Sequence, residues 1–361
     1  MLPELVTVHM STDPLALSVL DLVPVRTGQT TGQALAASTR LAQLADGAGY
    51  TRYWVAEHHN SAGVASTSPP VIISLLASAT ERIRVGSGGV MLPNHAPLAV
   101  AEQFALLEAA FPGRIDLGIG RAPGTDPVTS WALRSGGGAE GDPVAQFDDF
   151  VQHVIAFASS EGAAVRLQDR DFVITATPQA TTEPEVWLLG SSDYSARLAA
   201  RLGLPYVFAH HFAGQGTAEA IALYRDTFAG PGQPRTFLSV NAITADSVED
   251  ATDLALPHQH MMASLRSGRM ERKPLLTIEE ARAADPLLPP ESLQALRAPW
   301  LLGTAAEVAE QCRTLAAEFD VDEVMIHPVA GAHADDPLDR VPARERTITE
   351  LGEHLLKSNP A

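Results

Sequence analysis

The chain has 361 residues, of which 45% are hydrophobic and 19% charged, a composition that excludes extensive disorder and suffices for one large domain. A formal net charge of -18 gives a surface that repels polyphosphate and anionic headgroups, so nucleic acid and membrane are excluded as expected partners and a small-molecule site is favoured. The single cysteine, Cys312, excludes a disulfide framework and a multi-thiolate metal site, and it fits a reducing cytoplasm.

Eight apolar runs of strand length recur along the chain after an N-terminal extension, residues 1–14. The predicted strands are Ala16 to Val23, Arg52 to Ala56, Ile83 to Val90, Ile115 to Ile119, Val186 to Leu189, Tyr206 to Ala209, Phe237 to Ile243 and Glu323 to Ile326. Helical stretches lie between them, such as Thr30 to Ala48 and Pro97 to Ala110, which start and stop at capping residues, proline or glycine. Strict alternation of strand and helix predicts parallel pairing. Residues 15–361 are therefore expected to form a single α/β domain, a TIM-like (β/α)8 barrel.

Two connections are much longer than the usual few residues and are predicted to be insertions in the βα loops. One, Ala122 to Asp142, is glycine-rich, and the other, Leu256 to Trp300, mixes basic, methionine and proline residues. Long loops at a barrel mouth are often mobile, so residues 256–300 are a candidate lid. Insertions without a role are the alternative.

The second predicted strand ends in "YWVAEHHN", which places Glu57, His58 and His59 where a parallel barrel gathers its active site. Adjacent histidines on an extended chain point to opposite faces, so the pair is not expected to grip a metal ion. One histidine could face the pocket as an acid or base near neutral pH. Both histidines could instead be structural.

Glycines and polar residues mark three further strand ends. The segment "GSGGVMLP" carries Gly88 and Gly89 on a core strand, which indicates either a bulge or the close approach of a flat ligand. Arg121 ends "GIGR" and could clamp a phosphate or form an exposed salt bridge. In "LLGSSDYSARL", Ser191, Ser192 and Ser195 open a helix, where they could bind an anion or simply cap it.

These segments together resemble the luciferase-like flavin monooxygenase family, which includes the bacterial luciferase subunits. The resemblance runs through "GYTRYWVAEHHN", "SPPVIISLLASATERIRVGSGGVMLPNHAPLAVAEQFALLE", "PGRIDLGIGRAPGTDP" and "VWLLGSSDYSARLAARLGLPYVFAHHF". It implies a TIM-like barrel that binds reduced FMN, with O2 adding to the flavin as a C4a-peroxide that oxygenates a small-molecule substrate. An apolar or aromatic substrate, in secondary metabolism, is the expectation.

The resemblance also implies roles for particular residues. His58 matches the family's catalytic histidine and Glu57 the acid before it. Gly88 and Gly89 match a pair whose peptide bond is often cis and lies under the flavin ring. Arg121 matches a flavin-phosphate arginine, and Ser191, Ser192 and Ser195 match the phosphate-binding segment. Arg134 is a candidate second phosphate cation.

Partners follow from the same resemblance. A separate flavin reductase is expected to supply the reduced FMN, because no NAD(P)H domain is evident in the sequence. A homodimer is expected through the apolar helices Pro70 to Ala79 and Leu98 to Ala109. Two alternatives remain: an F420-dependent oxidoreductase of the same fold, and a non-catalytic flavin-binding protein.

Overall fold

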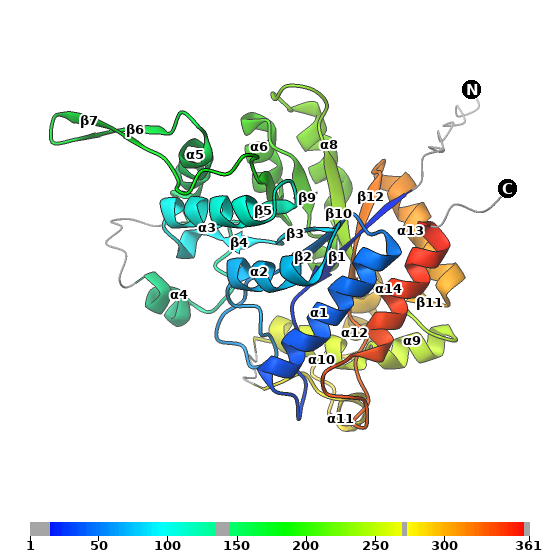
Figure 1. The fold of residues 1–361 in the computed structure, drawn as a ribbon. Coiled ribbons are helices and arrows are strands. Elements are labelled where there is room, and N and C mark those ends of the chain that lie inside the picture. The colour runs from blue at the N-terminus through cyan, green and yellow to red at the C-terminus, as the bar shows by residue number, and fades with distance from the viewer. Residues whose placement is uncertain (1–14, 135–143, 269–272, 357–361) are drawn as a thin grey trace, which may run out of the picture.

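A parallel barrel surrounded by helices forms the body of the molecule (Figure 1). The computed structural model describes residues 15–134, 144–268 and 273–356, so the N-terminal extension predicted for residues 1–14 lies outside them. In spatial order the barrel strands are β1 (Ala16–Asp21), β2 (Arg52–Val55), β3 (Arg84–Ser87), β5 (Ile115–Gly120), β8 (Glu185–Gly190), β9 (Tyr206–Phe208), β10 (Thr236–Thr244) and β12 (Glu323–Pro328). Strand β10 pairs with both β9 and β12, and β12 pairs with β1, which closes the circle. The predicted eight-stranded α/β barrel is confirmed.

The helices cover the outside of the barrel and its mouth. They are α1 (Thr31–Ala48), α2 (Pro69–Ala79), α3 (Pro97–Ala110), α4 (Pro127–Arg134), α5 (Phe147–Ala158), α6 (Asp193–Leu202), α7 (His210–Ala213), α8 (Thr217–Asp226), α9 (Val248–Leu254), α10 (Leu256–Arg266), α11 (Ile278–Ala283), α12 (Pro290–Arg297), α13 (Ala305–Phe319) and α14 (Pro342–Leu355), with a 3-10 turn at Leu92–Asn94. Thr30 caps α1 in a capping box with Gln33, which explains why the helix starts there. No helix of the described ranges is long and apolar enough to cross a membrane.

Three features differ from the sequence-based expectations. The predicted strand Ile83 to Val90 is divided into two strands, β3 and β4 (Val90–Met91). Between Gly86 and Val90, three residues lie opposite only two residues of β5, so the chain forms a β-bulge there. Outside the barrel, β6 (Ala163–Leu167) and β7 (Arg170–Ile174) form a hairpin that projects from the body beside α5, and β11 (Leu301–Gly303) pairs with β10 (Figure 1). The long connections contain helices: α4 in the first, and α10, α11 and α12 in the second.

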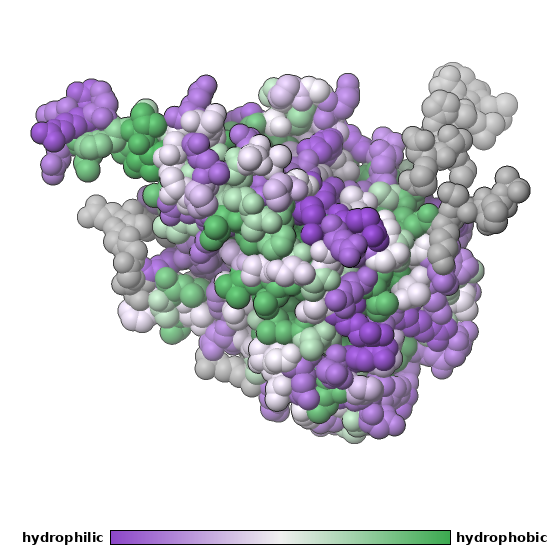
Figure 2. Space-filling model, in the orientation of Figure 1, coloured by the Kyte–Doolittle hydropathy of each residue, from purple (hydrophilic) through white to green (hydrophobic). Residues whose placement is uncertain are grey.

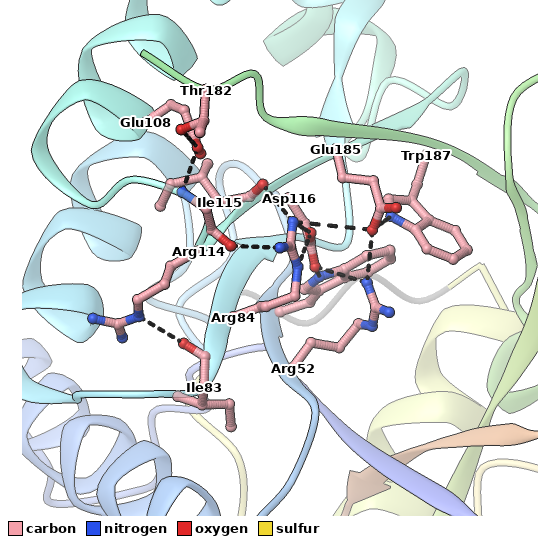
Figure 3. Close-up of polar contacts among 12 residues, drawn as sticks. Arg52, Ile83, Arg84, Glu108, Arg114, Ile115, Asp116, Thr182, Glu185 and Trp187 are labelled. Atoms are coloured by element: carbon pink, nitrogen blue, oxygen red, sulfur yellow. Dashed lines mark hydrogen bonds and ion pairs between the residues drawn. The ribbon is translucent and has the colours of Figure 1, made fainter. Parts of the chain in front are cut away.

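The N-terminal end of the barrel interior is closed by a buried ion network. Asp116 of β5 is fully buried and accepts hydrogen bonds from Arg52 at 2.9 Å and Arg84 at 2.7 Å. Arg52 also pairs with Glu323 at 2.8 Å, and its guanidinium lies 4.7 Å from the ring centre of Trp187. Figure 3 shows the charged side chains of β2, β3, β5 and β8 converging on this point. The opposite, C-terminal end of the barrel is therefore the end left for a ligand.

Candidate active site

Glu57 follows β2 at the C-terminal mouth and holds three segments together. Its carboxylate accepts hydrogen bonds from His59 Nε2 at 2.7 Å and His95 Nε2 at 2.8 Å, and the backbone N–H of Met91 donates to it at 2.9 Å. Burial raises the pKa of Glu57, but the hydrogen bonds from the two histidines and from Met91 outweigh it and bring the pKa to about 2. The ionised carboxylate accepts only, so both histidines carry their proton on Nε2.

His58 turns away from this cluster, as the alternation of an extended chain predicts. Its backbone N–H donates to the carbonyl oxygen of Ser66 at 2.9 Å, which fixes the main chain at the mouth. The ring is half-buried, and its Nδ1 is a buried atom with no hydrogen-bond partner. Burial lowers the pKa of His58, so the imidazole is neutral near pH 7. A neutral ring with a free nitrogen suits an acid or base that awaits a ligand.

Three further histidines share the mouth with His58. The ring centres of His211 and His327 lie 5.5 Å apart, and those of His258 and His327 lie 5.4 Å apart. Burial lowers the pKa of His211 to about 3, with smaller contributions from the electrostatic repulsion that protonated His58 and His210 would exert. His327 also lies within the electrostatic influence of His58, and burial lowers its pKa well below the usual value. His211 and His327 lie at or just after the ends of β9 and β12, whereas His258 comes from α10 inside the long connection, where no pattern in the sequence indicates a role at the mouth.

The side chains of His211 and His327 are held in place by β10. The hydroxyl of Ser239 lies 2.6 Å from His211 Nδ1, and Asn241 Oδ1 lies 2.8 Å from His327 Nδ1. Asn241 Nδ2 also donates to the carbonyl oxygen of His211 at 2.9 Å. These polar side chains, buried in the middle of the long strand β10, orient both rings within the mouth.

Gly88 and Gly89 form the bulge between β3 and β4, and the peptide bond between them is cis, as the resemblance implied. A Cβ on Gly88 would lie 2.8 Å from Leu20 Cδ1, and a Cβ on Gly89 would lie 2.7 Å from the carbonyl oxygen of Gly118. Both positions are therefore closed by the barrel's own packing. Glycine at these positions is explained by the steric alternative raised by the sequence, and a ligand is not needed to account for it.

The substitution Gly89→Ala is expected to destabilise the protein by about 1 to 3 kcal/mol. The new Cβ meets a carbonyl oxygen of β5, and β5 is held in register with β4 at Val90 and Ile119, so it cannot easily move away. Urea unfolding measures the loss. Gly47→Ala is the matched control, because a Cβ there meets nothing within 4 Å and alanine favours the helix interior. Wild-type stability in Gly89→Ala would contradict the packing argument.

Arg121 and the N-terminus of α6 come together, although some seventy residues separate them. The guanidinium carbon of Arg121 lies 3.9 Å from the centre of the Tyr194 ring, in the first turn of α6. Tyr194 donates to Asp148 of α5, which also accepts from Arg201 at 2.5 Å, so the ring is fixed from the other side. Arg121 is thus placed by stacking beside the positive end of a helix dipole.

The serines that open α6 have the arrangement of an anion-binding helix start. Ser192 is the N-cap residue, yet its side chain makes no capping hydrogen bond, and both Ser191 and Ser192 are exposed. Ser195 is 3% exposed and packs against Gly190. A Cβ on Gly190 would lie only 2.5 Å from the hydroxyl oxygen of Ser195. Asp193 pairs along the helix with Arg197 at 3.4 Å. The helix amides, two hydroxyls and Arg121 together fit a phosphate group.

Two further expectations from the sequence concern a second phosphate cation and the lack of a metal site. Arg134 ends α4, and its Nε is buried without a hydrogen-bond partner, so its position leaves a donor free. Over the described parts of the chain, no group of three or more histidine, cysteine or acidic side chains is arranged to hold a metal ion.

The described geometry is a parallel eight-stranded barrel with a cluster of histidines at its C-terminal mouth and the start of helix α6 near Arg121. The chain belongs to the luciferase-like monooxygenase family, whose model matches residues 15–323. A luciferase-like monooxygenase of Escherichia coli strain K12 is 40% identical over 324 residues, which cover 88% of this chain and 92% of that protein. An N-acetyl-S-alkylcysteine monooxygenase of Bacillus subtilis strain 168 is 33% identical and covers 86% of this chain and 91% of its own length. The protein is a monooxygenase of this family.

Solved structures share the same barrel. That of apo-MsnO8 is 32% identical, with a TM-score of 0.81 over 94% of this chain and 99% of its own. More distant structures include the oxygenating constituent of 3,6-diketocamphane monooxygenase from Pseudomonas putida in complex with FMN, 17% identical with a TM-score of 0.70 over 95% of this chain and 98% of that one. An F420-dependent secondary alcohol dehydrogenase, 13% identical, has a TM-score of 0.64 over 94% of this chain and 99% of its own. The last two likenesses show the fold alone.

Proposed function

We propose that the enzyme uses reduced FMN and O2 to oxygenate a small, apolar or aromatic organic substrate. The observation that carries the proposal is the meeting of Arg121 with the uncapped start of α6 at the same end of the barrel as His58. A flavin bound there would supply the electrons that activate O2 for transfer of one oxygen atom to the substrate. The relatives named monooxygenases support this choice.

The flavin phosphate would be held by Arg121, the hydroxyls of Ser191 and Ser192, and the amides at the start of α6. Ser195 would support the segment from its buried position against Gly190. The backbone of Gly88 and Gly89 lies in the bulge between β3 and β4, beside β5, where it would form one wall for the flavin ring. A phosphate monoester satisfies both the cation and the free helix amides, which otherwise have water as their partner.

His58 would exchange a proton with the substrate or the reacting oxygen, because its Nδ1 is free and its ring is neutral near pH 7. Glu57 makes no hydrogen bond to His58 and is engaged by His59, His95 and Met91. We therefore assign Glu57 a positioning role, in which it ties the end of β2 to the residues that follow β4. His58 is the group left to meet the reacting atoms.

Helices α10 to α12 would act as the lid predicted for residues 256–300. His258 of α10 brings its ring to within 5.4 Å of the His327 ring at the barrel mouth, and it packs against Trp300 at the other end of the segment. A cover of this kind excludes water from the reaction.

Mixing the protein with reduced FMN without oxygen, and then adding oxygen, tests the proposed function. The expected result is binding of reduced FMN, followed by reoxidation slower than that of free reduced FMN through a spectrum distinct from both flavin states. Substitution of Arg121 by methionine is expected to weaken FMN binding, since it removes a charge-assisted contact. Binding of F420 together with failure to bind FMN would overturn the proposal in favour of a hydride-transfer enzyme.

A separate flavin reductase would supply the reduced FMN, as the family resemblance implies. Addition of such a reductase and NADH to the protein would then sustain repeated turnover.

Cys312 is buried in α13 without a disulfide partner, so a reducing cytoplasm remains the proposed location.

A homodimer through α2 and α3 is also proposed. Val71 and Leu75 of α2 are 59% and 48% exposed, and Leu106 of α3 is 58% exposed. Figure 2 shows hydrophobic residues gathered over α2. Contiguous apolar surface of this kind is typical of interaction sites.

Light scattering of the wild-type protein is expected to give twice the monomer mass. Leu75→Glu is expected to give the monomer, whereas the control Leu167→Glu in the β6–β7 hairpin is expected to leave the dimer intact. A monomeric wild-type protein would contradict the proposal.

A further inference from the structure

A cleft at the barrel mouth lies beside the histidines of the site. The space between its walls is about 610 Å³ when the part open to solvent is included, and it lies between the ends of β1 and β12 and helix α10. The walls are mainly apolar, formed by residues such as Leu22, Pro24, Val64, Met261, Leu276 and Val329. His258 and His327 form part of the same wall, so the cleft adjoins the cluster that includes His58. A substrate in the cleft would reach the reacting end of the site.

Arg26 lines this cleft and has no counter-ion among the residues that the structure describes. The side chain is 5% exposed, and its acceptors are two backbone carbonyls, those of Asp336 at 2.6 Å and Pro337 at 3.3 Å, both bound by Nη2. Its Nε is buried with no hydrogen-bond partner. Within the described ranges, no carboxylate lies at ion-pair distance. Arg344 in the same wall differs, because it pairs with Asp21 at 2.7 Å.

The backbone around Arg26 is held firmly. The N–H of Thr27 donates to Leu275 O at 2.8 Å, and the N–H of Leu275 donates to Val25 O at 2.8 Å. The Arg26 N–H donates to the side chain of Gln29 at 3.1 Å. The cation is therefore positioned in advance, and a ligand need not order it. A buried cation that lacks a partner is unfavourable unless an anion joins it.

We propose that the cleft binds a small organic acid, with its carboxylate on Arg26 and its apolar part along the cleft toward His58 and His327. One unpaired guanidinium matches a monoanion. Because Nη2 is engaged by the carbonyls of Asp336 and Pro337, a carboxylate oxygen would accept from the remaining donors, Nη1 and Nε. A phosphate dianion would call for more positive charge than this wall offers. This inference rests on the proposed function in that it names the substrate class of the same site.

Calorimetric titration of the full-length, flavin-free protein tests the inference with three matched pairs of probes: hexanoate and hexanamide, octanoate and octanamide, phenylacetate and phenylacetamide. At least one acid is expected to bind about tenfold or more tightly than its amide, the effect of one charge-assisted hydrogen-bonded contact. Arg26→Gln is expected to remove that preference and leave amide binding unchanged. Arg82→Gln, at an exposed arginine on the surface, is the control and should retain it.

Three outcomes would overturn the inference: no preference for any acid, a preference that survives Arg26→Gln, or equal loss of acid and amide binding in a folded Arg26→Gln variant. If Arg26→Gln does not fold, Arg26→Lys keeps the charge and changes the arrangement of the donors. It should retain a preference for the acids that is reduced in size. No turnover is needed, so a protein that prefers the acids yet fails with reduced FMN would support this inference and refute the proposed cofactor.

Discussion

Replacement of His58 by alanine is expected to leave FMN binding unchanged and to reduce substrate oxygenation by about 100-fold or more. His58 stands at the mouth with a free Nδ1, while its neighbours Glu57, His59 and His95 are occupied with one another. The loss should therefore fall on proton transfer and not on the phosphate site at α6. The measurements are an FMN titration and the amount of oxygenated product per reduced FMN oxidised.

The matched control for this variant is His153→Ala, which removes an exposed histidine of α5 that stacks on Phe157. It should oxygenate substrate as the wild type does. Full oxygenation in His58→Ala would remove His58 from the mechanism, and loss of FMN binding would instead give it a role in holding the cofactor.

The substitution Arg52→Met is expected to lower the free energy of unfolding by about 3 to 5 kcal/mol. Arg52 is the cation between Asp116, which is fully buried, and Glu323, and its loss leaves those carboxylates short of positive charge inside the barrel. Burial lowers the pKa of Arg52, but the surrounding acids, Glu323 first, raise it above its usual value, so the guanidinium stays charged. Urea unfolding at neutral pH measures the change.

Arg166→Met serves as the control, because Arg166 is 68% exposed and forms only loose surface ion pairs, with Asp169 at 3.9 Å and Asp171 at 4.0 Å. Its effect should lie within about 0.5 kcal/mol, as for other surface ion pairs. A loss below about 1 kcal/mol in Arg52→Met would mean that the network is dispensable. Because the network lies at the end of the barrel opposite the mouth, folded Arg52→Met protein should keep its FMN affinity.

The barrel could be predicted from the sequence because strands buried on both faces leave an unmistakable pattern. Continuous apolar runs such as Arg52 to Ala56 and Phe237 to Ile243 alternate with capped helices, and this pattern admits few other folds. The hairpin of β6 and β7 was missed for the opposite reason. Its strands are largely exposed, so no burial pattern marks them, and they lie outside the alternation that identified the others.

The candidate site residues were found because they follow strand ends or resemble family motifs, and the structure decided how they are used. The adjacent histidines do face apart: His59 joins Glu57, while His58 leaves Nδ1 without a partner. The sequence could not show that Glu57 is also bound by His95, since that contact depends on how the segment after β4 lies against β2. His258 was missed because a helix in a long connection carries no signal of where it packs.

The sequence by itself determined the eightfold alternation, the capped helices and the family, because local hydrophobic periodicity and motif residues are properties of neighbours along the chain. The tertiary structure alone decided that Arg121 stacks on Tyr194, that Gly89 is closed by Gly118, and that Arg26 is buried with no carboxylate of the described ranges beside it. Each of these depends on segments far apart in the sequence. Closure of the barrel brings them together, and no local pattern records such a contact.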